Sequence, residues 1–109
     1  MNRRWHGKMR HLGALRGSGT LRRGDVVLGA ARYEIDCFST KPGEVVGSGE
    51  ISMAPAELAN ALGRHDLELV TDDGRVLALR FSSGRQDTAS GMAHADILGG
   101  LPAEDEWRR

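Results

Sequence analysis

The segment VVLGAARYEIDCFS, residues 26–39, decides the fold class of this chain. From Ala31 onward, apolar and charged side chains alternate strictly; the apolar set is Ala31, Tyr33, Ile35 and Cys37, and the charged set is Arg32, Glu34 and Asp36. Such alternation is typical of a strand that buries one face. The segment therefore predicts a long, half-buried strand, and Gly29 within it predicts a bend or bulge.

The segments on both sides of this strand also predict β-structure. Before it, residues 17–23 (GSGTLRR) form a short predicted strand that ends at the turn Gly24-Asp25. After it, the turn at residues 40–43 (TKPG) leads into a returning strand over residues 45–53, in which Gly47 and Gly49 share the face of Ile51. Glycines on that face predict a close approach of another backbone or a tight barrel corner.

A β-hairpin is predicted over residues 66–82 (DLELVTDDGRVLALRFS). A two-residue turn at Asp73-Gly74 would place Leu67 opposite a charged residue. A three-residue loop, Asp72-Asp73-Gly74, instead pairs Leu67 with Leu79 and Leu69 with Leu77, which keeps apolar side chains on one face. We therefore expect the three-residue loop, with Gly74 in the left-handed conformation.

The remaining segments complete a mainly β fold. Residues 54–63 (APAELANALG) predict one short helix, residues 82–90 a polar loop, and residues 91–98 (GMAHADIL) a last strand. We expect five to six antiparallel strands curled into a small barrel or roll, with the helix at one end. Residues 17–99 would form this single β-rich domain, and residues 100–109 a flexible tail in which Trp107 could act as an anchor.

Composition narrows the class further. The chain has 109 residues, 39% of them hydrophobic, and none of its apolar runs reaches the length of about 18–20 residues that a membrane span needs. The single cysteine, Cys37, excludes an intrachain disulfide framework and a multi-cysteine zinc site, and it favours a reducing, cytoplasmic location. Arginine outnumbers lysine 13 to 2, which is typical of a GC-rich bacterial genome. No cofactor is predicted.

Charge is distributed unevenly although the formal net charge is zero. Residues 1–24 carry seven basic and no acidic side chains, whereas residues 25–109 carry eight basic and fifteen acidic ones. Residues 1–16 are predicted to be a basic arm, whether a mobile arm, a short helix or an added strand. Candidate polyanion-binding residues are Arg3, Arg4, Trp5, Lys8, Arg10, Arg16, Arg22 and Arg23. Equally, the arm could lie against the acidic body of its own chain or of a dimer partner.

Motifs for catalysis or metal binding are sparse. Cys37 lies on the predicted core face without a sequence-local base, so core packing explains it better than a reactive thiol. His94 and Asp96 fall on one side of the last predicted strand, and His65 follows the helix; these are weak candidates for metal ligands. Glu34, Asp36 and Glu50 are predicted to lie on solvent-exposed faces.

The favoured function is therefore a non-enzymatic binding or regulatory module that acts through protein–protein contacts or self-association, and a homodimer is one expected form. A first alternative is binding of nucleic acid or another polyanion through the basic arm. A second is a small metal-dependent or thiol enzyme built on His94, Asp96 and Cys37.

Overall fold

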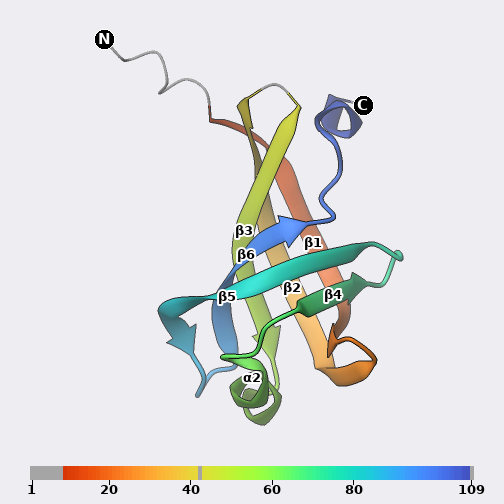
Figure 1. Cartoon of the computed structure of the whole chain (residues 1–109). Helices are drawn as coiled ribbons and strands as arrows, with labels where there is room; N and C mark the ends of the chain where they lie inside the picture. Colours follow the sequence, from red (N-terminus) through yellow and green to blue (C-terminus); the bar gives the residue numbers. More distant parts are fainter. Residues whose placement is uncertain (1–8, 42, 109) are drawn as a thin grey trace.

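The chain forms a closed six-stranded antiparallel β-barrel with one short helix (Figure 1). The computed structural model describes residues 9–41 and 43–108. Around the barrel the strand order is β1-β2-β3-β6-β5-β4. The elements are β1 (Arg10–Arg23), β2 (Val26–Lys41), β3 (Glu44–Met53), α2 (Pro55–Ala61), β4 (Leu67–Thr71), β5 (Val76–Asp87), β6 (Met92–Gly99) and the 3-10 helix η1 (Glu104–Arg108). The predicted fold class is confirmed.

The barrel interior holds the apolar faces that the alternation predicts. Ile35 and Cys37 of β2 are completely buried, while Glu34 and Asp36 between them are exposed. The hairpin of β4 and β5 pairs Leu67 with Leu79 and Leu69 with Leu77, as the three-residue loop requires. All four of these leucines are buried, so the choice of register places the side chains of the hairpin in the core.

Strand irregularities lie where glycine allows them. The register of β1 against β2 shifts between Leu21 and Arg22, which leaves Leu28 unpaired beside Gly29 and confirms the predicted bulge. At Gly49, an added Cβ would lie only 2.0 Å from the carbonyl oxygen of Glu34 on the neighbouring strand. Gly49 therefore allows β2 and β3 to approach closely, as predicted.

Two predicted strand boundaries are wrong. The first strand begins at Arg10 and not at Gly17, because residues 10–16 pair with β2, with one register shift between His11 and Gly13, and this pairing overrides their weak helical periodicity. The predicted polar loop over residues 82–90 is mostly strand, because β5 continues to Asp87 after a register shift beyond Phe81. Backbone pairing tolerates polar side chains when they can reach solvent. The helix is also shorter than expected and ends at Ala61, after which Leu62 is extended.

The C-terminal segment covers an inner face that the other strands leave open. β1, β2 and β3 extend beyond β5 and β6 at the end of the molecule where η1 lies (Figure 1). There Leu101 packs over Gly47, and Trp107 packs over Gly13. Glu104 accepts hydrogen bonds from the Arg10 side chain at 3.0 Å and from the backbone N–H of Gly43 at 2.9 Å. We call residues 101–108 the C-terminal cap.

Among the described residues, no helix is long and apolar enough to cross a membrane.

Candidate functional site

A row of charged side chains crosses four strands on the outer face of the barrel. Arg16 of β1 pairs with Glu34 of β2, Glu34 pairs with Glu50 of β3, and Glu50 pairs with His94 of β6. Because residues directly opposite one another in adjacent strands point to the same side of the sheet, these four side chains form one line.

A second polar row runs parallel to the first. Asp36 of β2 lies opposite Ser48 of β3, and Ser48 lies opposite Asp96 of β6. The Nε2 atom of His11 lies 3.2 Å from Asp36 Oδ1, and Ser82 donates a hydrogen bond of 3.1 Å to Asp96 Oδ2. The two rows together place four carboxylates on one surface.

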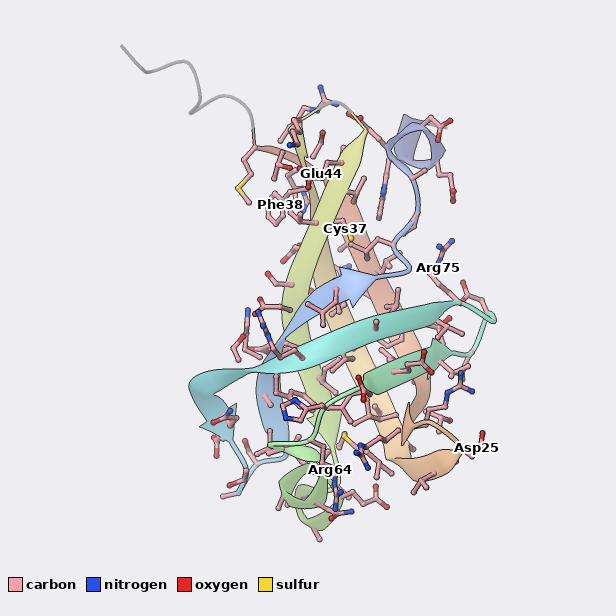
Figure 2. The ribbon with its side chains drawn as sticks, in the orientation of Figure 1. Asp25, Cys37, Phe38, Glu44, Arg64 and Arg75 are labelled. Atoms are coloured by element: carbon pink, nitrogen blue, oxygen red, sulfur yellow. The ribbon has the colours of Figure 1, made fainter. Side chains whose placement is uncertain are left out.

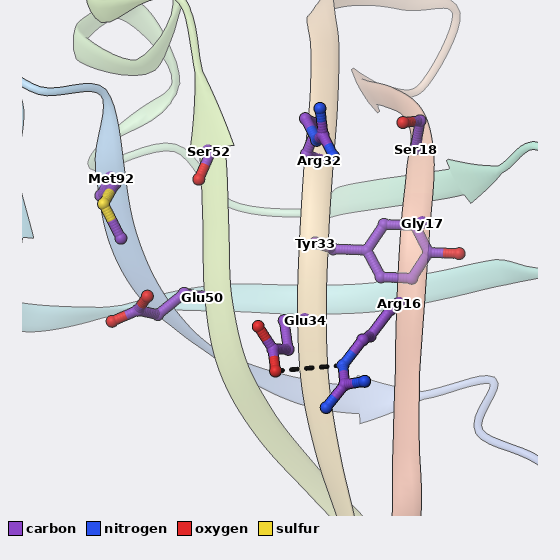
Figure 3. A pocket seen from close by; sticks show the side chains of 9 residues that line it. All are labelled: Arg16, Gly17, Ser18, Arg32, Tyr33, Glu34, Glu50, Ser52 and Met92. Carbon is purple, nitrogen blue, oxygen red and sulfur yellow. Dashed lines mark hydrogen bonds and ion pairs between the residues drawn. The ribbon is translucent and has the colours of Figure 1, made fainter.

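The surface between these rows is hollowed. A cavity of about 370 Å³ is lined by Glu34, Asp36, Phe38, Ser48, Gly49, Glu50 and His94. We call this cavity the acidic groove. A second cavity of about 450 Å³ shares Glu34 and Glu50 with it and continues past Arg16 and Arg32 (Figure 3). The acidic groove is thus one end of a longer polar depression whose other end is lined by arginines.

The carboxylates of Glu34 and Glu50 differ in how they are compensated. Arg16 Nε donates a hydrogen bond of 3.1 Å to Glu34 Oε2 (Figure 3). Within the described part of the chain, Glu50 forms neither an ion pair nor a hydrogen bond through its side chain. Figure 3 shows its carboxylate turned from Glu34 toward β6. Like charges directly opposite each other destabilise a sheet, so folding does not require an acidic side chain at both positions.

Each predicted polyanion-binding arginine among the described residues has a partner within the chain. Arg10 pairs with Glu104 at 3.0 Å, Arg16 with Glu34 at 3.1 Å, and Arg22 with Glu68 at 2.9 Å. Arg23 donates a hydrogen bond to the carbonyl oxygen of His65. The other members of that predicted set, Arg3, Arg4, Trp5 and Lys8, lie outside the described residues.

The three weak metal candidates are only partly brought together. His94 Nε2 lies 3.9 Å from Asp96 Oδ1, but His65 lies after α2, where its carbonyl oxygen binds Arg23. Across residues 9–41 and 43–108, no group of three or more His, Cys, Asp or Glu side chains is arranged to hold a metal ion. The structure gives these residues no common site.

Cys37 is buried in the barrel wall near the upper end of the molecule (Figure 2). Burial, together with the nearby charge of Asp36, raises the pKa of its thiol to about 11. A thiol with this pKa stays protonated at neutral pH, whereas nucleophilic cysteines need the thiolate. The residue behaves as a small apolar side chain of the core.

Sequence reasoning placed Glu34, Asp36 and Glu50 on exposed faces but did not bring them together. The signal that could have done so is the hairpin between β2 and β3. A register that pairs Tyr33 with Ile51 keeps both apolar faces inward, and that register sets Glu34 opposite Glu50. It requires an irregularity near the turn, which occurs between Ser39 and Lys41 and which the sequence does not reveal.

Comparisons with known proteins identify no relative. This chain matches no protein-family model, no curated protein and no solved structure. The fold and the groove therefore carry the functional argument.

Proposed function

We propose that this protein is a non-enzymatic binding module that holds a basic segment of a partner protein in the acidic groove. The observation that carries the proposal is the pairing of Glu34 directly opposite Glu50, with no cation of the described chain paired to Glu50. A guanidinium or ammonium group from a partner would offset this repulsion and leave the sheet intact.

The lining of the groove fits a protein segment better than a polyanion. Glu34, Asp36 and Glu50 give its floor a negative potential, which repels phosphate groups and attracts Arg and Lys side chains. Phe38 lies at one end and contacts the ring of His11 in an edge-to-face arrangement, with ring centroids 5.2 Å apart. The aromatic edge offers an apolar contact for the partner beside the charged one.

For the cellular location we propose the cytoplasm. The single cysteine is a free, buried thiol, as expected of a protein from a reducing compartment. This use of cysteine supports the proposed location.

Binding can be measured with defined peptides. We expect an eight-residue peptide of alternating Arg and Gly to bind, and the matching Glu and Gly peptide not to bind. In a heteronuclear NMR titration, the shifted amides should cluster at Ser48, Glu50 and His94. Binding should weaken as salt is added, because exposed charge pairs are screened.

Charge-matched variants make the test specific to the groove. Glu50→Gln should weaken the Arg peptide about threefold to fivefold, which corresponds to about 0.7–1 kcal/mol for one exposed charge pair. Glu34→Gln/Glu50→Gln should weaken it further. The control Asp25→Asn/Asp105→Asn changes net charge equally at two exposed positions without groove contacts. Equal weakening by the control, or binding of the Glu peptide, would refute the proposal.

A further inference from the structure

The barrel closes over only part of β1, which leaves an open strand edge. β4 pairs with β1 through residues 19–23, and Asp72 donates one more backbone hydrogen bond to Ser18. In the described chain, residues 10–17 pair with β2 on one side and with no strand on the other. An open edge presents backbone N–H and C=O groups that can pair with another strand.

The side chains along this edge restrict what can pair with it. On the outer face, Ala14 lies beside Asp36, and Arg16 lies beside Glu34. An added strand should bring a cation next to Ala14, where it can approach Asp36, and a small neutral residue next to Arg16. Read in the opposite direction, the β1 edge itself offers this pair of residues: Arg16, a cation, followed by Ala14, a small neutral residue. A second copy running antiparallel would therefore place its Arg16 opposite Ala14 and its Ala14 opposite Arg16.

We infer that this protein forms a two-fold homodimer in which the β1 edges of two copies pair antiparallel, centred on Leu15. On the outer face, two rows of side chains then cross the junction between the copies. Each row consists of Glu34 and Arg16 of one copy followed by Ala14 and Asp36 of the second copy. Neighbouring strands are about 4.8 Å apart, so the long Arg16 side chain can extend past a methyl group toward the second carboxylate.

The two registers shifted toward Arg16 and Gly17 are opposed by charge. Centring the pair on Arg16 would place two guanidinium groups directly opposite each other. Centring it on Gly17 would put Arg16 beside Ser18 of the second copy, whose neighbour on β2 is Arg32. Like charges at these positions destabilise the sheet, so the register centred on Leu15 is favoured over these two.

The inner face of the same edge accepts this register. The half-buried Leu15 meets its own copy, which adds an apolar contact at the junction. Gly13 lies opposite Gly17 of the second copy. Trp107 already covers Gly13 and the Tyr33 ring covers Gly17, so side chains at these two positions would compete with both rings. A two-fold pairing uses the same surface twice and closes without further growth.

The oligomeric state tests the inference directly. Sedimentation equilibrium on the full chain should give a mass about twice 11.8 kDa at high concentration and a reversible fall on dilution. Arg16→Glu should raise the dimer dissociation constant about tenfold or more, because it puts acidic groups together in both rows of the dimer. Arg32→Glu, on the same outer face but one strand away from the edge, should change it far less.

Crosslinking tests the register. Leu15→Cys should form an intermolecular disulfide under mild oxidation, because directly opposite residues of an antiparallel pair fall within disulfide range. Ser18→Cys should not, and the wild-type chain should stay uncrosslinked because Cys37 is buried. Hydrogen exchange of the wild-type chain should also show protection of residues 10–17 that rises with concentration.

A chain that stays monomeric up to millimolar concentration, without concentration-dependent protection at this edge, overturns the inference. So does a dimer that Arg16→Glu leaves intact and that Leu15→Cys does not crosslink. Either result leaves the proposed groove function standing, because that function depends on Glu50 of β3, which is not part of the dimer contact.

Discussion

The C-terminal cap contains a buried polar atom whose cost can be measured. The Nε1 atom of Trp107 is buried and has no hydrogen-bond partner among the described residues. Its ring packs so closely on β1 that a Cβ added at Gly13 would lie 2.8 Å from ring atom Cζ3. Trp107 therefore contributes apolar packing while leaving one donor unsatisfied, and two substitutions separate these effects.

Trp107→Phe removes the donor and keeps most of the ring. Removing an unsatisfied buried N–H should raise the free energy of unfolding by about 1–3 kcal/mol. Loss of roughly 40 Å² of apolar surface costs about 1 kcal/mol at about 25 cal/mol per Å². We expect the free energy of unfolding to stay unchanged or to rise by up to about 2 kcal/mol. Trp107→Ala removes the ring as well and should lower it by about 2–3 kcal/mol, less than a fully buried tryptophan would.

Urea unfolding at 25 °C, followed by circular dichroism, measures both variants. Both midpoints should move without a change in the denaturant slope, because the same surface is exposed on unfolding. If Trp107→Phe were as destabilising as Trp107→Ala, the indole N–H would have to be hydrogen-bonded, and the reasoning would be wrong. The same scan on Glu104→Gln reports how far the rest of the cap depends on its hydrogen bonds to Arg10 and Gly43.

Two further predictions concern the barrel wall. Gly49→Ala should lower the free energy of unfolding by about 2–3 kcal/mol, because its Cβ would meet the Glu34 carbonyl oxygen at 2.0 Å. Gly99→Ala is the control: it has open space around it and should change the free energy of unfolding by less than about 0.5 kcal/mol. Equal unfolding midpoints for the two variants would contradict this prediction. The pKa of Cys37 is raised to about 11 in the folded chain, against an ordinary value of 9.0. As pH rises, the unfolded chain therefore loses its thiol proton before the folded chain does. The contribution of this thiol to stability is complete below pH about 9 and is lost as pH rises toward 11. Cys37→Ala should remove the decline in the free energy of unfolding between pH 9 and 10. The range ends at pH 10 because burial also raises the pKa of Tyr33 above its ordinary 10.0, so that Tyr33 contributes to the decline at higher pH. An identical pH profile in chemical denaturation would show that the thiol is not the cause.

Local patterns in the sequence account for the sidedness of the strands. Ile35 and Cys37 alternate with Glu34 and Asp36 in the sequence, and the structure buries the first pair and exposes the second. The register of the β4–β5 hairpin also follows from the chain, because the three-residue loop keeps its leucines on one face and the two-residue turn does not. Both inferences hold because side-chain direction in a strand has a period of two residues and the turn fixes the pairing.

The length of β1 and the path of β5 did not follow from local pattern. Residues 10–16 contain glycine and lack alternation, yet the ladder with β2 holds them in a strand. Residues beyond Phe81 are polar, yet β5 pairs again with β6 at Gln86. In both places, hydrogen bonds to a neighbouring strand outweighed intrinsic preference, and those neighbours are distant in sequence.

By itself, the sequence determined which side of each strand is apolar, where the main turns fall, and that the product is a small antiparallel β fold. Only the tertiary structure decided that Arg16, Glu34, Glu50 and His94 form one line and that the first part of β1 keeps an open edge. The reason is physical: local periodicity sets the direction of each side chain, whereas cross-strand neighbours depend on bulges, register and barrel closure, which arise from contacts between residues far apart in the chain.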